Sequence, residues 1–314
     1  MPGPFTRGWK LRAVYAQSTP VRDPTLLPMR VMSETNQRPL EAGIAVDLKP
    51  GGSYGDYLRL DLILSAQEPR ANGQHDEMLF IIQHQTSELW MKLFLHELDL
   101  ATRLVREDRL QESFKAFARI AQIQRVLLEQ WAVLETMTPA DYMRFRDTLG
   151  QSSGFQSFQY RAIEFALGNK DANALLPHRS APDTHAWLHA RLVAPSLYDE
   201  FLRHLARRGF VIPVEKLQRD FSLPYENDAR VLAVIGEVYA DTEAHWEAYD
   251  LCEKLVDIEG RFQNWRFRHM TTVKRIIGFR PGTGGSSGVG FLQQALNLTF
   301  FPELWDVRTS LRMP

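Results

Sequence analysis

The sequence predicts an all-α protein, and three observations support this. From Ser53 onward, Leu, Ala, Gln, Glu and Arg dominate, alternating β-branched runs are few, and apolar residues recur at helical spacing. The chain has 314 residues, of which 44% are hydrophobic and 24% charged, so it can bury a full core. We therefore expect one helical domain over residues 53–314 and exclude fibrous and wholly disordered proteins.

Residues 1–52 are predicted to form an N-terminal arm, partly disordered or an extension. They mix Pro, Gly, Thr and Arg without periodicity, and Met32 is a possible later start. Their basic residues Lys10 and Arg12 are not followed by the apolar run of a signal peptide, which predicts that the protein is not secreted.

Three helices are predicted to build the core. Ser53 can cap the first, which runs to about Gln67, and the longer ones cover about 76–106 and 110–136. A short helix follows, with Thr138 as its N-cap, Pro139 at its first position and Gly150 just beyond its end.

The second half of the chain alternates helices with connections. Ser152 or Ser153 opens a helix that stops at Gly168, and residues 169–182 and 209–227, rich in Pro, Asn and Asp, are predicted connections. Residues 229–277 should be helical with at most one break, near Gly260.

Charge and cysteine content exclude several classes of protein. The 37 Lys and Arg residues balance 38 Asp and Glu, so no overall field holds the chain on nucleic acid or an anionic membrane. Charged or amide residues interrupt even the most apolar segment, Met78 to Val105, so we expect a soluble protein. The single cysteine, Cys252, permits no internal disulfide or CxxC site, which is typical of the cytosol. A cytoplasmic location is expected.

Most metal-binding patterns fail among the nine histidines. None has an acidic residue three positions before it, and HExxH is absent. His185 and His189 are four residues apart but lack a nearby third ligand, so a solvated helix face is the simpler interpretation.

Two histidines lie in apolar surroundings. His269 belongs to a stripe at helical spacing, and His84 shares a helix face with Phe80 and Ser87. Each could be a core histidine with a satisfied hydrogen bond, and burial with one free ring nitrogen also suits an axial haem ligand. The stripe consists of Leu255, Ile258, Phe262, Trp265, His269, Val273 and Ile276.

A cationic stretch surrounds His269. Between Glu259 and Glu303 there is no acidic residue, and the stretch contains Arg261, Arg266, Arg268, Lys274, Arg275 and Arg280. These side chains could lie on a solvated face or bond helix-end carbonyls, and they could also bind haem propionates, a carboxylate substrate or nucleic acid. We expect an anionic partner there, and the balanced overall charge argues against nucleic acid.

Two further features point to a ligand. The glycine-rich segment 278–290 lacks a phosphate-loop GK[ST] and follows a helix, so it is either a flexible turn or a mobile loop that closes over a ligand. Tyr142 and Arg146 lie one turn apart, where Arg146 could be a surface residue or clamp a carboxylate.

Five motifs resemble the tryptophan 2,3-dioxygenase family, in the family's order. They are YGDYLRLD (Tyr54–Asp61), HDEMLFIIQHQTSELW (His75–Trp90), SSGFQS (Ser152–Ser157), WRFRHM (Trp265–Met270) and GTGGSSG (Gly282–Gly288). The resemblance covers essentially Tyr54 to Arg308, and the arm before Gly52 has no counterpart.

This resemblance implies a haem b enzyme, ferrous when active, that inserts both atoms of O₂ across the indole C2–C3 bond of L-tryptophan to give N-formylkynurenine. By the same resemblance His269 is the proximal ligand of the haem iron, and His84 is the distal histidine, which bonds the indole N–H and orients the ring. A role for His84 as a base is less strongly implied, because the indole nitrogen is a very weak acid.

The resemblance also assigns substrate contacts. Arg146, beside Tyr142, pairs with the carboxylate, Thr283 contacts the ammonium group, and the remaining assignments line the pocket. Phe80 packs on the indole, Ser153 and Gly154 line the pocket near the haem, and Tyr54, Tyr57 and Leu58 reach the site of a neighbouring subunit in a homotetramer.

Three other interpretations compete with this one. A related indole-ring dioxygenase would differ only in substrate breadth, and the Arg146 and Thr283 pair favours the free amino acid. A nucleic-acid-binding module predicts steeply salt-dependent binding and no pigment. A purely structural helical oligomer leaves the clustered cations and the glycine-rich loop without a role.

Overall fold

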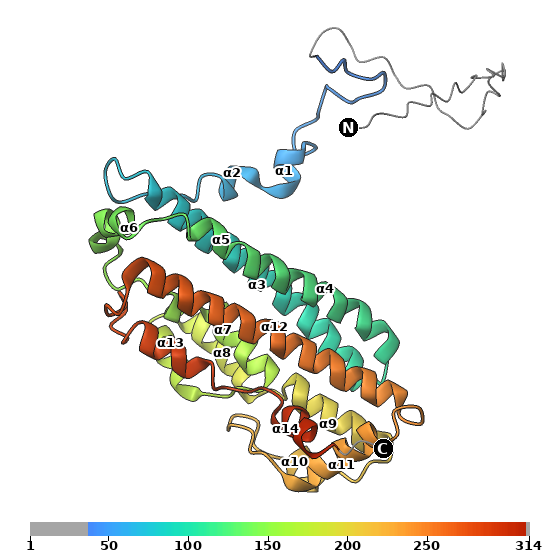
Figure 1. Ribbon diagram of the computed structural model, residues 1–314. Coiled ribbons are helices and arrows are strands. Elements are labelled where there is room, and N and C mark those ends of the chain that lie inside the picture. The colour runs from blue at the N-terminus through green and yellow to red at the C-terminus, as the bar shows by residue number, and fades with distance from the viewer. Residues whose placement is uncertain (1–36, 312–314) are drawn as a thin grey trace, which may run out of the picture. The chain divides into compact units, whose positions relative to one another are not determined.

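The computed structural model describes residues 37–311, and in this range it contains helices and no strand, which confirms the all-α prediction (Figure 1). The chain divides into an N-terminal unit that ends at Asp61 and a helical body from Leu62 onward. Most of the predicted arm, including Met32, lies outside the described residues, and the boundary between residues 52 and 53 stays a prediction.

The N-terminal unit contains α1 (Tyr54–Leu58), and α2 (Leu60–Ile63) follows it. Ser53 caps α1 as predicted, in a reciprocal capping box with Asp56. The prediction of one helix to Gln67 is wrong, because Arg59 adopts a left-handed conformation with φ +53° that ends α1.

The first half of the body contains α3 (Asp76–Arg106), α4 (Leu110–Glu129), α5 (Trp131–Leu134), α6 (Pro139–Phe145), α7 (Phe158–Leu167) and the 3₁₀ turns η1 (Arg146–Leu149) and η2 (Gly154–Gln156). The second half contains η3 (Ala172–His178), α8 (Pro182–Val193), α9 (Leu197–Arg207), α10 (Val214–Leu217), α11 (Ala229–Ala240), α12 (Trp246–Ile277), α13 (Val289–Ala295) and α14 (Pro302–Ser310).

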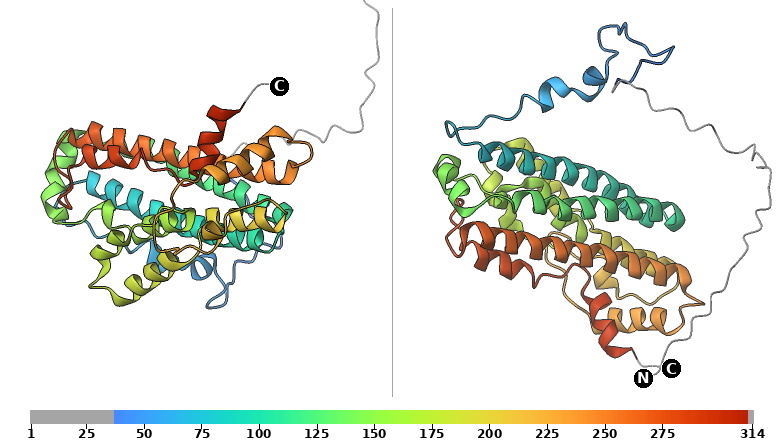
Figure 2. Two further views of the ribbon diagram at one scale, coloured as in Figure 1. Left: turned by 90° about the horizontal axis from the view of Figure 1, so that it is seen from below. Right: turned by 45° about the horizontal axis from the view of Figure 1, so that its top comes forward.

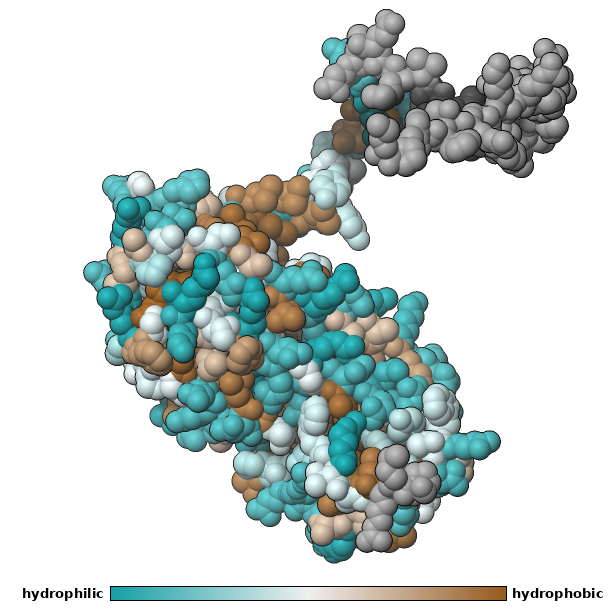
Figure 3. All heavy atoms as spheres, in the orientation of Figure 1, coloured by the Kyte–Doolittle hydropathy of each residue, from teal (hydrophilic) through white to brown (hydrophobic). Residues whose placement is uncertain are grey.

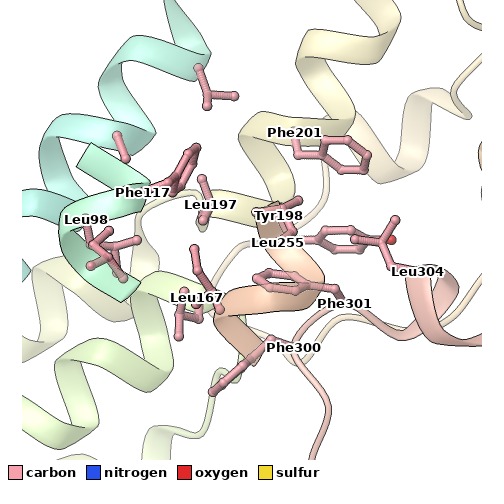
Figure 4. Close-up of a cluster of buried hydrophobic side chains, with 14 of the residues drawn as sticks. Leu98, Phe117, Leu167, Leu197, Tyr198, Phe201, Leu255, Phe300, Phe301 and Leu304 are labelled. Atoms are coloured by element: carbon pink, nitrogen blue, oxygen red, sulfur yellow. The ribbon is translucent and has the colours of Figure 1, made fainter. Parts of the chain in front are cut away.

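Three long helices form the frame of the body. The helix α4 packs against both α3 and α12, while α7 and α9 cover α3, α13 packs on α12 and α11 packs on α14 (Figures 1 and 2). Their facing side chains form one large apolar core, part of which is shown in Figure 4. It includes Leu98, Phe117, Leu167, Leu197, Tyr198, Phe201, Leu255, Phe300, Phe301 and Leu304.

Two predicted boundaries are wrong by a few residues. The helix expected over 110–136 is interrupted at Gln130, where the bonding tightens to an i→i+3 bond from the Val133 N–H to the Gln130 carbonyl. Ser153 opens only the 3₁₀ turn η2, and Ser157 is the residue that caps α7.

The predicted break near Gly260 is also wrong. Gly260 lies inside α12, and the break falls at residues 241–245, where α11 ends and the Asp241 side chain accepts a bond from the Ala244 N–H. This local bond competes with continuation of the helix. By contrast, the bounds of α3 and the capping box of Thr138 on α6 confirm their predictions.

The body has two distinct ends. The N-terminal part of α3, α6, the C-terminal part of α12 and the loop before α13 gather at one end, and α9, α10, α11 and α14 lie at the other (Figure 1). On the face seen in Figure 3 the body is mostly hydrophilic. Within residues 37–311, no helix has the length and apolar character that crossing a membrane requires.

Candidate active site

His84 projects from α3 as a neutral, oriented imidazole. Its Nδ1 lies 2.7 Å from the Phe80 carbonyl oxygen one turn earlier, so Nδ1 carries the proton and donates it. Burial lowers the pKa of His84, which keeps the ring neutral near pH 7. The other nitrogen, Nε2, therefore presents a lone pair that can accept a hydrogen bond.

His269 projects from α12 and contacts two indole rings that also contact each other. Its ring stacks on Trp131 at 4.8 Å between centroids and 13° between planes, and Trp265 lies 5.3 Å away. Burial, with a smaller contribution from His84, lowers the pKa of His269 to about 4, so the two imidazoles lie within electrostatic reach of each other. Across residues 37–311, no group hydrogen-bonds the His269 ring.

The Phe80 ring links His84 to a cluster of aromatic side chains. The Phe80 ring lies 4.2 Å from the His84 ring, 6.0 Å from Tyr142 and 5.6 Å from Phe145. Burial raises the pKa of the Tyr142 phenol, which stays protonated at neutral pH although Arg146 opposes the shift. The structure thus brings three of the predicted site residues, Phe80, His84 and Tyr142, into one cluster.

Arg146 meets the glycine-rich loop at the end of α6. Its Nη2 donates to the Pro281 carbonyl at 2.5 Å, and Thr283 Oγ1 donates to the Ser152 carbonyl at 2.5 Å. These two bonds tie residues 278–290 to the segment that contains Ser153. The structure therefore brings Arg146, Thr283 and Ser153 to the same end of the body.

Two glycines allow this close approach. A Cβ at Gly284 would lie 2.8 Å from the Ser153 Cβ, and a Cβ at Gly288, which has φ +65°, would lie 2.5 Å from the Arg280 carbonyl oxygen. Gly284 is thus required by the contact with Ser153 and Gly288 by the fold of the loop itself. Gly154, which follows Ser153, begins η2 and is exposed.

Three predicted residues lie outside the helical body. Tyr54, Tyr57 and Leu58 belong to α1 in the N-terminal unit, where Tyr54 is 75% and Tyr57 86% exposed. Their assignment to a neighbouring subunit's site is a proposal taken up below.

The cationic stretch turns out to be mixed. Arg266 is buried and pairs with Glu164 at 2.9 Å, and Arg261 and Arg268 also have carboxylate partners within the chain, so these three do not await an external anion. The other three, Lys274, Arg275 and Arg280, line an open hollow of about 690 Å³ at the end of α12. Half of the stretch is therefore paired within the chain, and an anionic partner stays a prediction for the cations at the end of α12.

Two parts of the site were not found from the sequence. Trp131 lies far from His269 in the chain, and nothing in its local pattern predicts that its ring stacks on that imidazole. Glu135 accepts bonds from α12 on both sides of His269, a contact equally invisible in sequence. His185 and His189 belong to no group of three or more candidate metal ligands within residues 37–311.

Taken together, the site offers two neutral imidazoles from different helices, with a guanidinium and a hydroxyl at the same end. An imidazole without a hydrogen bond can bind a metal-containing cofactor, and the guanidinium can bind a carboxylate. These are the groups expected of a helical enzyme that acts on an acidic small molecule with the help of a cofactor.

Comparison with known proteins identifies the family. The family model for tryptophan 2,3-dioxygenase matches residues 40–237 and 228–311. Tryptophan 2,3-dioxygenase of Myxococcus xanthus is 63% identical over 280 residues, covering 89% of this chain and 96% of that protein. The enzymes so named in Serratia proteamaculans and Bacillus cereus are 59% and 53% identical, over 88% and 89% of this chain and 99% and 100% of theirs. The chain belongs to the tryptophan 2,3-dioxygenase family, a family of dioxygenases.

Proposed function

We propose that this chain binds haem b and catalyses the insertion of both atoms of O₂ across the indole C2–C3 bond of L-tryptophan. The product is N-formyl-L-kynurenine, and the reaction is the first step of tryptophan catabolism by the kynurenine pathway. The observation that carries the proposal is the pair of neutral imidazoles, His84 and His269, which come from two long helices and lie within electrostatic reach of each other.

The residues present fit a haem. A histidine that holds a haem iron must be neutral and have a free ring nitrogen, and the low pKa of His269 together with its unbonded ring would let it hold the iron. The rings of Trp131 and Trp265 contact this imidazole and each other, which fixes its surroundings. When bound in its ferrous form, haem supplies the iron at which O₂ reacts.

His84 orients the indole ring of the substrate. Because its Nδ1 is committed to the Phe80 carbonyl, its Nε2 can only accept, and the indole N–H is a donor of the right kind. This bond fixes the ring, and the adjacent Phe80 packs against it. Removal of the indole proton by His84 is less favoured, since the imidazole is a weak base at its lowered pKa.

Arg146 and Thr283 select the two charged ends of an amino acid. Arg146 uses one N–H on Pro281 and keeps other donors for the substrate carboxylate. The Thr283 hydroxyl donates to Ser152, so its lone pairs are oriented to accept from the substrate ammonium group. Tyr142, beside Arg146, and Ser153 with Gly154 complete the wall of the pocket.

The proposal includes a homotetramer in the cytoplasm. Tyr54 and Tyr57 are large apolar side chains that α1 leaves exposed, which supports their use, with Leu58, in closing the site of a neighbouring subunit. One chain alone would then form an incomplete site.

The decisive experiment is a visible spectrum of the haem-loaded ferrous protein with and without L-tryptophan, followed by admission of O₂. We expect a Soret band that shifts with L-tryptophan and then formation of N-formylkynurenine. A protein that binds haem but oxidises simple indoles as well as L-tryptophan would instead be a broader indole-ring dioxygenase. Absence of a stoichiometric haem band would exclude the proposal.

His84→Ala separates the two histidine roles. It should retain haem and oxidise L-tryptophan more slowly, because only the orienting bond is lost. An unchanged rate would remove His84 from the reaction.

A further inference from the structure

We propose that Glu135 is a positioning residue for the His269 imidazole. It holds the segment that contains Trp131 against α12, and Trp131 in turn fixes the plane of the His269 ring. The inference rests on the assignment of His269 as the haem ligand under the proposed function.

Glu135 bonds to α12 at three points. Its Oε2 accepts from Arg268 Nη2 at 2.5 Å, its Oε1 accepts from Thr272 Oγ1 at 2.7 Å, and its backbone carbonyl accepts from Arg275 Nε at 3.2 Å. The first two donors lie directly before His269 and three residues after it. Glu135 therefore ties the end of α5 to the part of α12 that carries the imidazole.

The bond to Thr272 is protected from water. Thr272 is only 1% exposed, and Glu135 is itself about one-fifth exposed. Both carboxylate oxygens are engaged at once, which fixes the orientation of the Glu135 side chain as well as its position. This geometry distinguishes it from the ion pair of Arg261 with Asp257, which joins two residues of α12 itself.

Trp131 transmits this constraint to His269. It lies one turn before Glu135, and its ring is nearly parallel to the imidazole. Within the described part of the chain the Trp131 Nε1 is buried without a hydrogen-bond partner, so packing and the position of α5 alone fix the indole. His269 also lacks a hydrogen bond, whereas His84 is held by Phe80. The proximal ring is thus oriented by stacking, and the stacking depends on Glu135.

The test compares Glu135→Gln with a matched control, Glu253→Gln. Glu253 lies on α12 and, like Glu135, binds an arginine of another segment, Arg308 of α14 at 2.7 Å, but it is 16 residues from His269, about 24 Å along the helix. Both substitutions remove one charge and keep the side-chain size. The measurements are the iron–imidazole stretching band of the ferrous protein and the rate of haem transfer to apomyoglobin.

We expect Glu135→Gln to shift or broaden the stretching band and to lose haem about tenfold faster, as loss of a partner behind a metal ligand typically does. Glu253→Gln should match the wild type in both. Equal behaviour of the two variants, whether both unchanged or both altered, would overturn the positioning role.

Thr272→Val provides a milder second variant in case Glu135→Gln folds poorly. It removes one of the two side-chain bonds with little change in shape, and it should shift the band in the same direction by less. A stretching band in Thr272→Val that is identical to that of the wild type would contradict the proposal. If the wild type itself shows no iron–imidazole band, the proposed function fails, and not the role of Glu135.

Discussion

The Glu303 carboxylate at one end of the helical body and the imidazoles of His84 and His269 at the other differ in how fully their polar atoms are bonded. At the end formed by α9, α11 and α14, the buried Glu303 accepts bonds from the Tyr198 and Tyr225 hydroxyls at 2.7 Å and from the Asp228 N–H at 2.8 Å. At the other end, His84 keeps one ring nitrogen unbonded and His269 makes no hydrogen bond within residues 37–311. Saturated groups stabilise the fold, and unsaturated ones are available to a ligand.

The largest effect should come from His269→Ala, which tests the unsaturated end. Haem retention should fall by more than the roughly 10- to 100-fold that loss of an outer partner costs, because the ligand itself is removed. The haem-free protein should lose only about 1 kcal/mol of unfolding free energy, since no hydrogen bond is broken. Haem titration and urea unfolding measure the two quantities. Full haem retention would show that another residue binds the iron.

Glu303→Ala tests the end formed by α9, α11 and α14. In contrast to His269→Ala, it should reduce the unfolding free energy and leave haem binding unchanged. Two phenols and a backbone N–H would be left buried without an acceptor, so we expect a loss of about 3 to 5 kcal/mol in unfolding free energy. Haem affinity of the molecules that remain folded should not change. Urea unfolding with a parallel haem titration provides the check, and a loss below about 1 kcal/mol would mean that water replaces the carboxylate at this end.

The sequence predicted the frame of the body well because its signals are local. The bounds of α3 and the caps of α6 depend on residues within one turn, such as Thr138 with Asp141. The predicted helix ends were wrong where a helix stops because of a left-handed backbone conformation, as at Arg59, or a competing side-chain hydrogen bond, as at Asp241. A helix pattern does not reveal which of two adjacent serines, or a third at Ser157, will be the cap.

The candidate site likewise contains residues that the sequence predicted and residues that it did not. The apolar stripe and the family motifs selected His84, Arg146, Thr283 and His269, and the structure brings these to one end of the body. Trp131 and Glu135 could not be found, since their contacts with α12 join residues more than 130 positions apart. The sequence did not reveal for the same reason that Arg266 in the cationic stretch is paired within the chain, because its partner Glu164 is 102 residues away.

Arg146→Leu tests substrate recognition at the end of the body that contains His84 and His269, separately from stability. Arg146 is half-buried, so a lost carboxylate contact should weaken L-tryptophan binding by about 2 kcal/mol, or roughly 30-fold. Tryptamine, which lacks the carboxylate, should bind almost unchanged. Optical titration of the haem-loaded protein with both compounds measures the difference. An equal loss for the two ligands would count against a carboxylate clamp.

Asp108→Asn tests the far end with the smallest expected effect. Asp108 follows α3 with φ +60°, which Asn tolerates, and its carboxylate accepts bonds from Arg207 and His204 on α9. The Arg207 hydrogen bond lowers the pKa of Asp108 to about 2 from its usual 3.8. Because the side chain is about one-third exposed, solvent screening should limit its contribution to about 1 kcal/mol.

The contribution of Asp108 to the unfolding free energy depends on pH because its pKa is lower in the folded state. The unfolded carboxyl takes up a proton at higher pH than the folded one, so the contribution of Asp108 is fully present above about pH 5 and is lost as the pH falls toward 2. The difference in unfolding free energy between wild type and Asp108→Asn should therefore shrink between about pH 5 and pH 3. Urea unfolding of both proteins across this range measures it. A difference that stays constant with pH would assign the effect to packing and not to the charge of Asp108.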